Sequence, residues 1–463
     1  MKNSYSPTRH FTRQHPLITG TLLLTAAGFL SRFIGFFYRI YLSRVFGEEG
    51  MGIYQLIHPI SALTFSLTAA AFQTAVSKFV AAQTTPSHKY KPLFLCAGIS
   101  LPLSVLTSVL LFFGASPIAT YYLAEPRTEI LIQLLSFTVP FSAAHACING
   151  FFYGIQRASV PAGTQFLEQI CRVGSVYLLS AYLHTCGQTP NLSVIVIGLI
   201  VGEAAGLMGA VFSFKKVCKK DSPFHDESPS PVTYRALLSM IIPLMANRVF
   251  LNTLQSLEAV SLPARLQAYG YDRSTSLRVY GVLTGMAFPL IFFPNALTGS
   301  VSVVLLPNIS ENMAKNRKRE VKKTITQTIQ YCSILGFFCM GIFLFFGRAI
   351  GIYAFQSELA GYFISELSFL CPFLYLNSTL SGILQGLGKA GALFFCNITA
   401  LLIRLLMIYT AVPIFGMQGY LWGVLISQIL LTAFCLFFIM ISFKKSRKTN
   451  SNLTKKLAPS CGK

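Results

Sequence analysis

The chain alternates between long apolar runs and short polar breaks. An α-helix needs roughly 20 mostly apolar residues to cross the hydrocarbon core of a membrane, and it satisfies its own backbone polar groups there. The pattern therefore predicts an all-α polytopic membrane protein of about 12 transmembrane helices. The predicted spans lie near residues 17–43, 53–83, 92–115, 128–153, 162–184, 191–214, 234–260, 278–307, 325–346, 359–385, 391–412 and 416–443. The first run is too long for a cleaved signal peptide and carries Arg32 and Arg39, so we interpret it as a spanning helix.

The composition agrees with a membrane protein. Of the 463 residues, 53% are hydrophobic and 11% are charged, and the mean hydropathy is +0.59, whereas a soluble protein would carry roughly 25% charged residues. The 11 cysteines include no pair at CxxC spacing, so neither a metal site nor a disulfide framework is predicted. Because no Walker A, GxSxG or HExxH motif occurs, we expect neither catalysis nor a cofactor.

The positive charge is distributed unevenly along the chain. A formal net charge of +22 would suggest a nucleic-acid partner in a soluble protein. Here most Lys and Arg residues fall in both terminal segments and in alternate breaks, such as 215–235 and 315–323. The other breaks hold only a few: Arg44, Arg127, Arg265, Arg273, Arg278 and Arg348. Because basic residues are retained on the cytoplasmic side, we expect a cell-membrane protein with both termini in the cytoplasm and no nucleic-acid partner.

An internal repeat predicts two halves. Gly150–Ala158 matches Gly382–Ala390 at an offset of 232 residues, and the same offset carries Arg172 onto Arg404. Since each half would hold an even number of spans, we expect two parallel six-helix bundles, an architecture for alternating access. The expected divisions are a first bundle at 1–215, a basic cytoplasmic linker at 216–233, a second bundle at 234–443 and a basic cytoplasmic tail at 444–463.

Charged side chains inside a membrane are costly, so each one is a functional candidate by default. The interiors of the predicted spans contain the cations Arg32, Arg39, Arg172, Arg248 and Arg404 and the acids Glu168, Glu203 and Glu258, with Glu366 nearer the end of its span. An excess of arginine predicts a cavity suited to an anionic group, particularly a phosphate, because the guanidinium presents a planar fork of donors.

The arginines differ in their sequence context. Arg32 and Arg39 are two helical turns apart and share a face; they line a cavity, or instead reach the interface or an acidic partner. Glu168 and Arg172 have the i, i+4 spacing of an intrahelical ion pair, which fits a structural role as well as substrate binding. Arg404 lacks such an acid four residues earlier and is the better substrate candidate. Arg248 is a further candidate.

The remaining candidates are acids and histidines. Glu258 is predicted either to pair with an arginine or to bind a coupling cation. Glu203 is flanked by glycines and is predicted to take part in helix packing with a buried partner. His58 and His145 have no further ligands at metal-site spacing, so we interpret them as hydrogen-bonded helix contacts.

Four stretches carry a family resemblance. They are Leu30–Leu42 with Phe46–Tyr54, Gln165–Val173, Leu262–Gly270, and Tyr280–Leu290 with Leu306–Ser310. In these stretches the chain resembles the stage V sporulation protein B group of polysaccharide-export proteins. That group belongs to the MOP superfamily, together with the MurJ lipid II flippases and the MATE drug exporters.

The resemblance implies a V-shaped pair of six-helix bundles that alternates between inward-facing and outward-facing states. It also implies a cationic central cavity for the diphosphate of an undecaprenyl-linked sugar. Arg32, Arg39 and Arg265 would contribute to substrate binding. Many relatives have fourteen spans, the last two forming a groove for the lipid tail, whereas twelve are predicted here.

These observations favour a flippase for lipid II or a similar lipid-linked peptidoglycan precursor, serving cell-wall or spore-cortex synthesis. The expected partners are the lipid-linked oligosaccharide, membrane lipid, a coupling cation and cell-wall synthesis enzymes. Alternatives are a flippase for another lipid-linked polysaccharide, a MATE-type ion-coupled drug exporter, and a scaffold without transport. A drug exporter would be expected to have an acidic cavity, and a scaffold need not bear the cost of intramembrane arginines. We expect Arg32→Ala to abolish transport.

Overall fold

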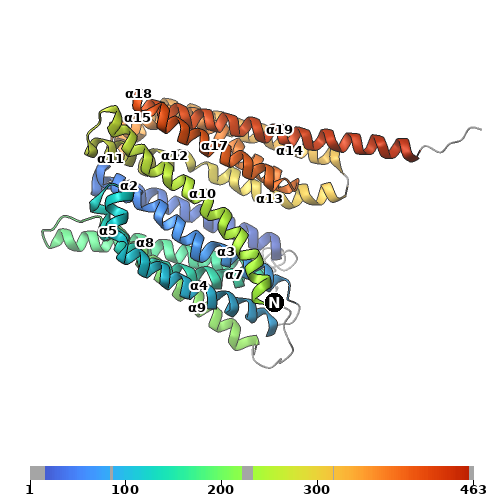
Figure 1. Cartoon of the computed structure of the whole chain (residues 1–463), viewed down its shortest axis with the longest axis horizontal. Coiled ribbons are helices and arrows are strands. Elements are labelled where there is room, and N and C mark those ends of the chain that lie inside the picture. Colours follow the sequence, from blue (N-terminus) through green and yellow to red (C-terminus); the bar gives the residue numbers. More distant parts are fainter. Residues whose placement is uncertain (1–15, 84–86, 222–232, 316, 458–463) are drawn as a thin grey trace, which may run out of the picture. The chain divides into compact units, whose positions relative to one another are not determined.

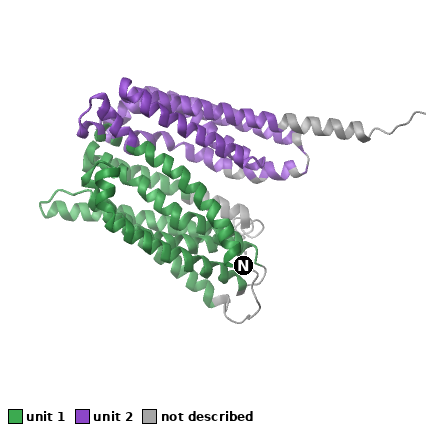
Figure 2. Cartoon of the chain, viewed as in Figure 1, with its two compact units in different colours: residues 1–260, 277–281 green, residues 261–276, 282–463 purple. Residues whose placement is uncertain are grey.

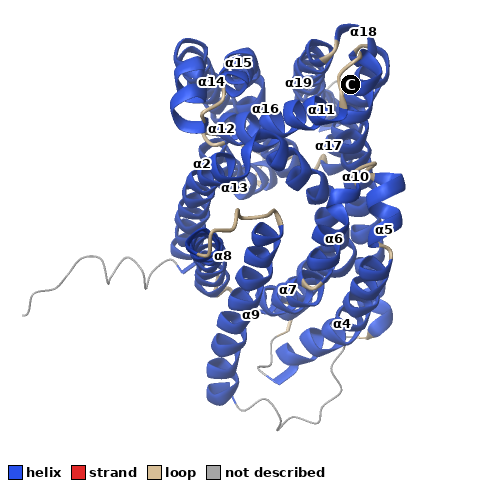
Figure 3. Ribbon diagram, turned by 90° about the vertical axis from the view of Figure 1, so that its left-hand side faces the viewer, coloured by secondary structure: helices blue, strands red, loops and turns tan. Residues whose placement is uncertain are grey.

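The computed structural model describes residues 16–83, 87–221, 233–315 and 317–457. Throughout these ranges the chain is built of helices joined by short turns, and no strand occurs in them (Figure 3). Figure 1 follows the helices along the chain from α2 to α19. The all-α prediction is therefore confirmed. The basic residues before position 16 and the last one of the tail, Lys463, lie outside the described residues.

Many of these helices are long and apolar. Among the described residues, nine helices meet the length and hydropathy of a membrane span, or ten if the bent pair Pro126–Ser136 and Thr138–Gly154 counts as one span. One of the nine, Gly28–Ala81, is 54 residues long and covers parts of the first two predicted spans. The chain is therefore a multi-pass membrane protein, and the count of twelve spans stays a prediction.

The helices form two compact units (Figure 2). The first unit comprises residues 1–260 and 277–281, and the second comprises 261–276 and 282–463. The first unit holds α2 (Pro16–Phe65), η1 (Ser66–Ala70), α3 (Ala71–Ala81), η2 (Ser87–Lys89), α4 (Tyr90–Phe113), α5 (Ala115–Pro117), η3 (Ile118–Tyr122), η4 (Pro126–Thr128), α6 (Glu129–Ser136), α7 (Thr138–Gly154), α8 (Ser159–Thr185) and α9 (Ser193–Asp221). Two helices, α10 (Tyr234–Tyr269) and α11 (Arg273–Gly281), contribute to both units.

The second unit continues the chain to its last described helix. It holds η5 (Val282–Ala287), α12 (Phe288–Phe292), α13 (Asn295–Ala314), α14 (Lys318–Phe355), α15 (Glu358–Leu367), η6 (Ser368–Leu370), α16 (Cys371–Gly386), α17 (Ala390–Thr410), α18 (Val412–Phe415) and α19 (Met417–Leu457). The predicted bundle boundary at 216–233 falls mostly outside the described residues and stays a prediction.

Each unit has its own apolar core. In the first, Phe72 and Val76 of α3 pack with Phe151 and Phe152 of α7, and Leu237 of α10 joins them. In the second, side chains of α13, α14, α16, α17 and α19 meet; they include Ile309, Ile325, Ile383, Cys396 and Cys435. The buried cysteines therefore act as small apolar packing residues.

A glycine breaks the long first helix. Gly47 has φ of 70°, a left-handed conformation that side chains with a Cβ rarely adopt. The chain turns there, and the next residue, Glu48, forms an ion pair with Arg278 of α11. One turn on, a Cβ on Gly52 would lie 2.1 Å from the carbonyl oxygen of Leu277. Close approach of α2 and α11 within the first unit therefore requires glycine at this position.

The two repeat segments occupy equivalent local structures. Gly154 ends α7 and Gly386 ends α16, and two residues later Gln156 and Gly388 have φ of 60° and 70°. A Cβ on Gly154 would lie 2.6 Å from the Cβ of Val80 of α3, and the glycines of the second copy pack in the same way against α13. The repeat is thus a repeated helix end with a close glycine contact.

Candidate functional site

Arg39 lies on α2 of the first unit and projects into protein. Its Nη1 atom is buried and has no hydrogen-bond partner among the described residues. Tyr38, Tyr54 and His58 lie within electrostatic range of its guanidinium. A buried charged donor without an acceptor is costly to maintain. Arg39 can therefore donate a hydrogen bond to an anionic ligand.

Arg172 lies on α8, which packs against α2. Tyr41 and Tyr177 face each other across this contact with ring centroids 5.7 Å apart. Arg172 lies within electrostatic range of Tyr38 and His58, the same side chains that neighbour Arg39. The fold thus brings together two of the predicted arginines from α2 and α8.

The predicted Glu168–Arg172 ion pair is present. The Nη2 of Arg172 donates to Oε1 of Glu168, with 21% and 16% of the two side chains exposed. The Nε atom of Arg172 is buried and has no hydrogen-bond partner among the described residues. The pair therefore leaves part of the guanidinium fork available to a second acceptor.

Four glycines on α9 allow this helix to approach α8 closely. A Cβ on Gly198 would lie 2.2 Å from Cγ2 of Val176, one on Gly202 would lie 3.0 Å from Cβ of Arg172, and one on Gly206 would lie 2.9 Å from Cε1 of His145. Gly209 continues the same face. Small residues at such spacing let membrane helices pack backbone to backbone. This glycine seam (Gly198, Gly202, Gly206 and Gly209) places Glu203 beside α7 and α8.

His145 of α7 lies close to both Glu168 and Glu203. Its Nε2 is 3.2 Å from Oγ1 of Thr164, which agrees with the predicted helix contact. Its Nδ1 is 3.8 Å from Oε2 of Glu203. One ligand atom each from His145, Glu168 and Glu203 lies within 4.8 Å of the others. Imidazole nitrogen and carboxylate oxygens are suited to a bound cation or a shared proton, with Arg172 competing for Glu168.

We call these six residues the polar cluster. It consists of Arg39, His58, His145, Glu168, Arg172 and Glu203, drawn from α2, α7, α8 and α9 of the first unit. With both acids ionised and both histidines neutral, its two arginines are balanced. Loss of one negative charge would leave it net positive. Binding of a cation or a proton to the cluster would therefore raise its affinity for an anion.

The other candidates of the first unit lie apart in sequence and differ in environment. Arg248 is exposed on α10, with its Nη2 3.5 Å from Oγ1 of Thr74. Arg32 is exposed on α2, two turns before Arg39. Glu258 is buried near the end of α10, with 7% of its surface exposed. Their predicted roles stay predictions.

Two predicted arginines belong to the second unit. The guanidinium of Arg265 lies over the ring of Tyr409, 4.4 Å from its centroid, a cation–π arrangement. The Tyr409 hydroxyl is in turn 2.9 Å from Oγ of Ser261. Arg404 is half-buried on α17. The offset that relates Arg172 to Arg404 also relates His145 to Asn377, which donates to Gln428 and accepts from Thr432.

The sequence matches the model of the polysaccharide biosynthesis protein family over residues 17–313. The chain is 27% identical over 423 residues to stage V sporulation protein B of Bacillus subtilis, covering 90% of this chain and 82% of that protein. It is 23% identical over 343 residues to lipid II flippase MurJ of the same organism, covering 68% and 61%.

Solved structures share the fold. The lipid II flippase MurJ in an inward closed conformation aligns with a TM-score of 0.66 and 18% identity, covering 90% of this chain and 87% of that chain. An inward-facing multidrug resistance MATE family transporter of the MOP superfamily aligns with a TM-score of 0.66 and 14% identity, covering 92% and 96%. At these identities the likeness shows the fold.

Proposed function

The chain belongs to the polysaccharide biosynthesis protein family, and on that premise we propose that it is a flippase for an undecaprenyl-diphosphate-linked peptidoglycan precursor. The substrate is lipid II or a similar molecule, carried from the cytoplasmic to the outer leaflet by alternating access. The observation that carries the proposal is the pair of arginines in the polar cluster, Arg39 and Arg172. Each holds a buried guanidinium nitrogen that has no acceptor among the described residues.

The chemistry of the diphosphate fits these donors. Its oxygens would accept hydrogen bonds from Arg39 and from the Nε of Arg172. Such charge-assisted hydrogen bonds are stronger than those between neutral groups. Binding would let Arg172 divide its donors between Glu168 and the substrate, or leave Glu168 altogether. The sugar itself needs no cation, so the arginines recognise the common diphosphate rather than one glycan.

Coupling would act through the acids of the cluster. A proton or a cation at His145 and Glu203 offsets negative charge, so the arginines attract the diphosphate more strongly. Thermodynamic linkage then requires that the bound diphosphate also strengthens cation or proton binding. Release of the proton or cation on the opposite side of the membrane would therefore favour release of the diphosphate there. Glu258, buried on α10, is the second candidate for coupling.

The alternatives differ in the charge of the cargo. A flippase for another lipid-linked polysaccharide repeat would use the same arginines for the same diphosphate. A MATE-type exporter of cationic drugs would have to bring its cargo beside Arg39 and Arg172, which is electrostatically unfavourable. The buried guanidinium donors of Arg39 and Arg172, which have no acceptor among the described residues, therefore favour a phosphate-bearing lipid.

Reconstitution tests the proposal. The purified chain would be placed in liposomes that contain a fluorescent undecaprenyl-diphosphate sugar, and outward movement would be followed with a membrane-impermeant quencher. We expect transport by the wild type, and loss of at least about tenfold in Arg172→Ala, since hydrogen bonds to charged groups contribute about 1.5–3 kcal/mol. Arg319→Ala, which removes an exposed arginine of α14, is the matched control. Equal transport by Arg172→Ala and the control would refute the site.

A further inference from the structure

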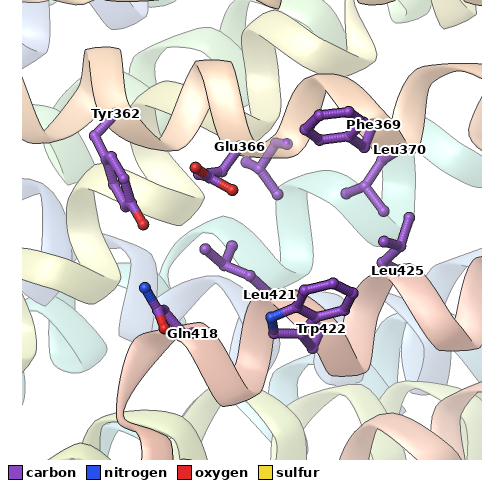
Figure 4. Close-up of a pocket in the computed structure, with 9 residues that line it drawn as sticks. Tyr362, Glu366, Phe369, Leu370, Gln418, Leu421, Trp422 and Leu425 are labelled. Atoms are coloured by element: carbon purple, nitrogen blue, oxygen red, sulfur yellow. The ribbon is translucent and has the colours of Figure 1, made fainter.

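The second unit contains a pocket outside the polar cluster. It lies between α15 with η6 on one side and the start of α19 on the other, and its volume is about 410 Å³. Pockets that hold small organic ligands commonly measure about 300–1,000 Å³. Tyr362, Glu366 and Phe369 line one wall, and Gln418, Trp422 and Leu425 line the other (Figure 4). All of these residues belong to a single unit.

The pocket is polar at one end and apolar at the other. Figure 4 shows the side chains of Tyr362, Glu366 and Gln418 gathered at one end, with Phe369, Leu370, Trp422 and Leu425 farther along. This order follows from the sequence, because both walls begin with their polar residues and continue with apolar ones at helical spacing. A matching ligand has a polar head and a hydrocarbon chain.

The charge of the pocket indicates which kind of lipid headgroup it can bind. Glu366 is the only carboxylate among the lining residues, and no lysine or arginine lines the pocket. A carboxylate accepts hydrogen bonds and attracts an ammonium group. The Tyr362 hydroxyl and the Gln418 amide can donate to a phosphate oxygen beside that ammonium group. An undecaprenyl diphosphate would place at least two negative charges against Glu366, so the pocket is unsuited to the substrate's own head.

We propose that this pocket binds a bilayer lipid with a primary amine in a zwitterionic head, of the phosphatidylethanolamine class. The ammonium group contacts Glu366, and the phosphate accepts from Tyr362 and Gln418. One acyl chain runs along Phe369, Trp422 and Leu425. The site would let the second unit sense the lipid composition of its membrane, independently of whether the chain transports lipid II.

A tryptophan in the pocket can be used as a fluorescent probe of lipid binding. Trp422 is the single tryptophan of the sequence and it lines the pocket, with 61% of its surface exposed, so its fluorescence reports on lipid in the pocket and immediately around it. The full chain would be reconstituted in phosphatidylcholine vesicles that contain phosphatidylethanolamine or phosphatidylcholine with brominated acyl chains, which quench tryptophan on contact. We expect the brominated phosphatidylethanolamine to associate about threefold more strongly, the effect of one partly exposed ion pair.

Matched variants separate the pocket from the general lipid surroundings. Glu366→Gln should make the two brominated lipids quench equally, while Glu358→Gln, which removes an exposed acid from the same helix outside the pocket, should keep the preference. Leu425→Phe fills the apolar end and should also remove the preference. Circular dichroism checks that each variant is folded.

Three results would overturn the proposal. The first is equal quenching of the wild type by both lipids, and the second is a preference that survives Glu366→Gln. The third is displacement of the brominated phosphatidylethanolamine by undecaprenyl phosphate more readily than by unlabelled phosphatidylethanolamine, which would identify the pocket as a seat for the substrate tail. None of these depends on transport, so failure here is distinguishable from failure of the proposed function.

Discussion

Arg172 donates to Glu168 one turn earlier on α8, while its own Nε is buried without an acceptor among the described residues. The acid therefore holds the guanidinium in place without satisfying it. In the proposed flippase, Arg172 is a preorganised donor for the phosphate. Glu168 holds its guanidinium in position while no substrate is bound. Competition between the carboxylate and the diphosphate would keep the substrate from binding too tightly to be released.

Removing the competing carboxylate should strengthen substrate binding. In Glu168→Gln, Arg172 keeps its position beside a neutral acceptor, and we expect the undecaprenyl-diphosphate substrate to bind about three- to tenfold more tightly. Turnover should fall, because release becomes slower. Equilibrium binding and single-turnover transport measure the two effects. Glu311→Gln removes an exposed acid that Lys315 pairs with and is the control. Weaker binding in Glu168→Gln would show that the pair positions Arg172 instead of competing for it.

Coupling through Glu203 predicts that substrate binding depends on the charge of this side chain, which lies 3.8 Å from Nδ1 of His145. Removing its negative charge leaves the arginines of the polar cluster less compensated, so Glu203→Gln should bind the undecaprenyl-diphosphate substrate several-fold more tightly than the wild type. Equilibrium binding curves at one pH and one salt concentration provide the measurement. Equal affinity of Glu203→Gln and the wild type would remove Glu203 from the coupling site.

The glycine seam makes a prediction about stability. Gly198→Val places a branched side chain where a Cβ alone would lie 2.2 Å from Cγ2 of Val176, and overpacking of this kind costs about 1–3 kcal/mol. We therefore expect a lower thermal unfolding temperature in detergent. Gly174→Ala on α8 meets nothing within 4 Å and should be neutral or slightly stabilising. Similar melting of the two variants would show that α8 and α9 can separate at no cost.

Arg265 should depend on an aromatic partner. Tyr409→Leu removes the ring over which its guanidinium lies, whereas Tyr409→Phe keeps the ring and removes only the hydroxyl that contacts Ser261. If Arg265 takes part in transport in this stacked position, Tyr409→Leu should reduce transport several-fold and Tyr409→Phe should retain most of it. The reconstituted transport assay compares them. Equal activity of both variants would show that transport does not depend on the stacked position of Arg265.

Local patterns predicted part of the site. The i, i+4 spacing of Glu168 and Arg172 correctly predicts their ion pair, and the repeated Gly150 and Gly382 segments have equivalent helix ends in the structure. Both features depend on neighbours within a helix turn or on a direct repeat. The family assignment, carried by longer stretches such as Leu30–Leu42, is also confirmed.

Features assembled from several helices were not predicted. His145, Glu168 and Glu203 come from α7, α8 and α9, so no short spacing in the sequence signals that their ligand atoms converge. The glycines of α9, three or four residues apart, correctly predict a closely packed helix beside Glu203, but they do not identify His145 and Glu168 as its neighbours. The pocket at Glu366 and Trp422 likewise joins α15 to α19, and only packing brings its two walls together.

Rescue of a bacterium depleted of its own lipid II flippase tests the cationic substrate site most directly. Wild type, Arg39→Ala, Arg32→Ala and the control Arg319→Ala would be expressed, their folded amounts in the membrane matched, and lipid II on the outer face measured. We expect wild type and Arg319→Ala to restore outer-face lipid II, and Arg39→Ala and Arg32→Ala not to restore it. Full restoration by Arg39→Ala would contradict the cationic site, and failure of a well-inserted wild type would move the substrate to another lipid-linked glycan.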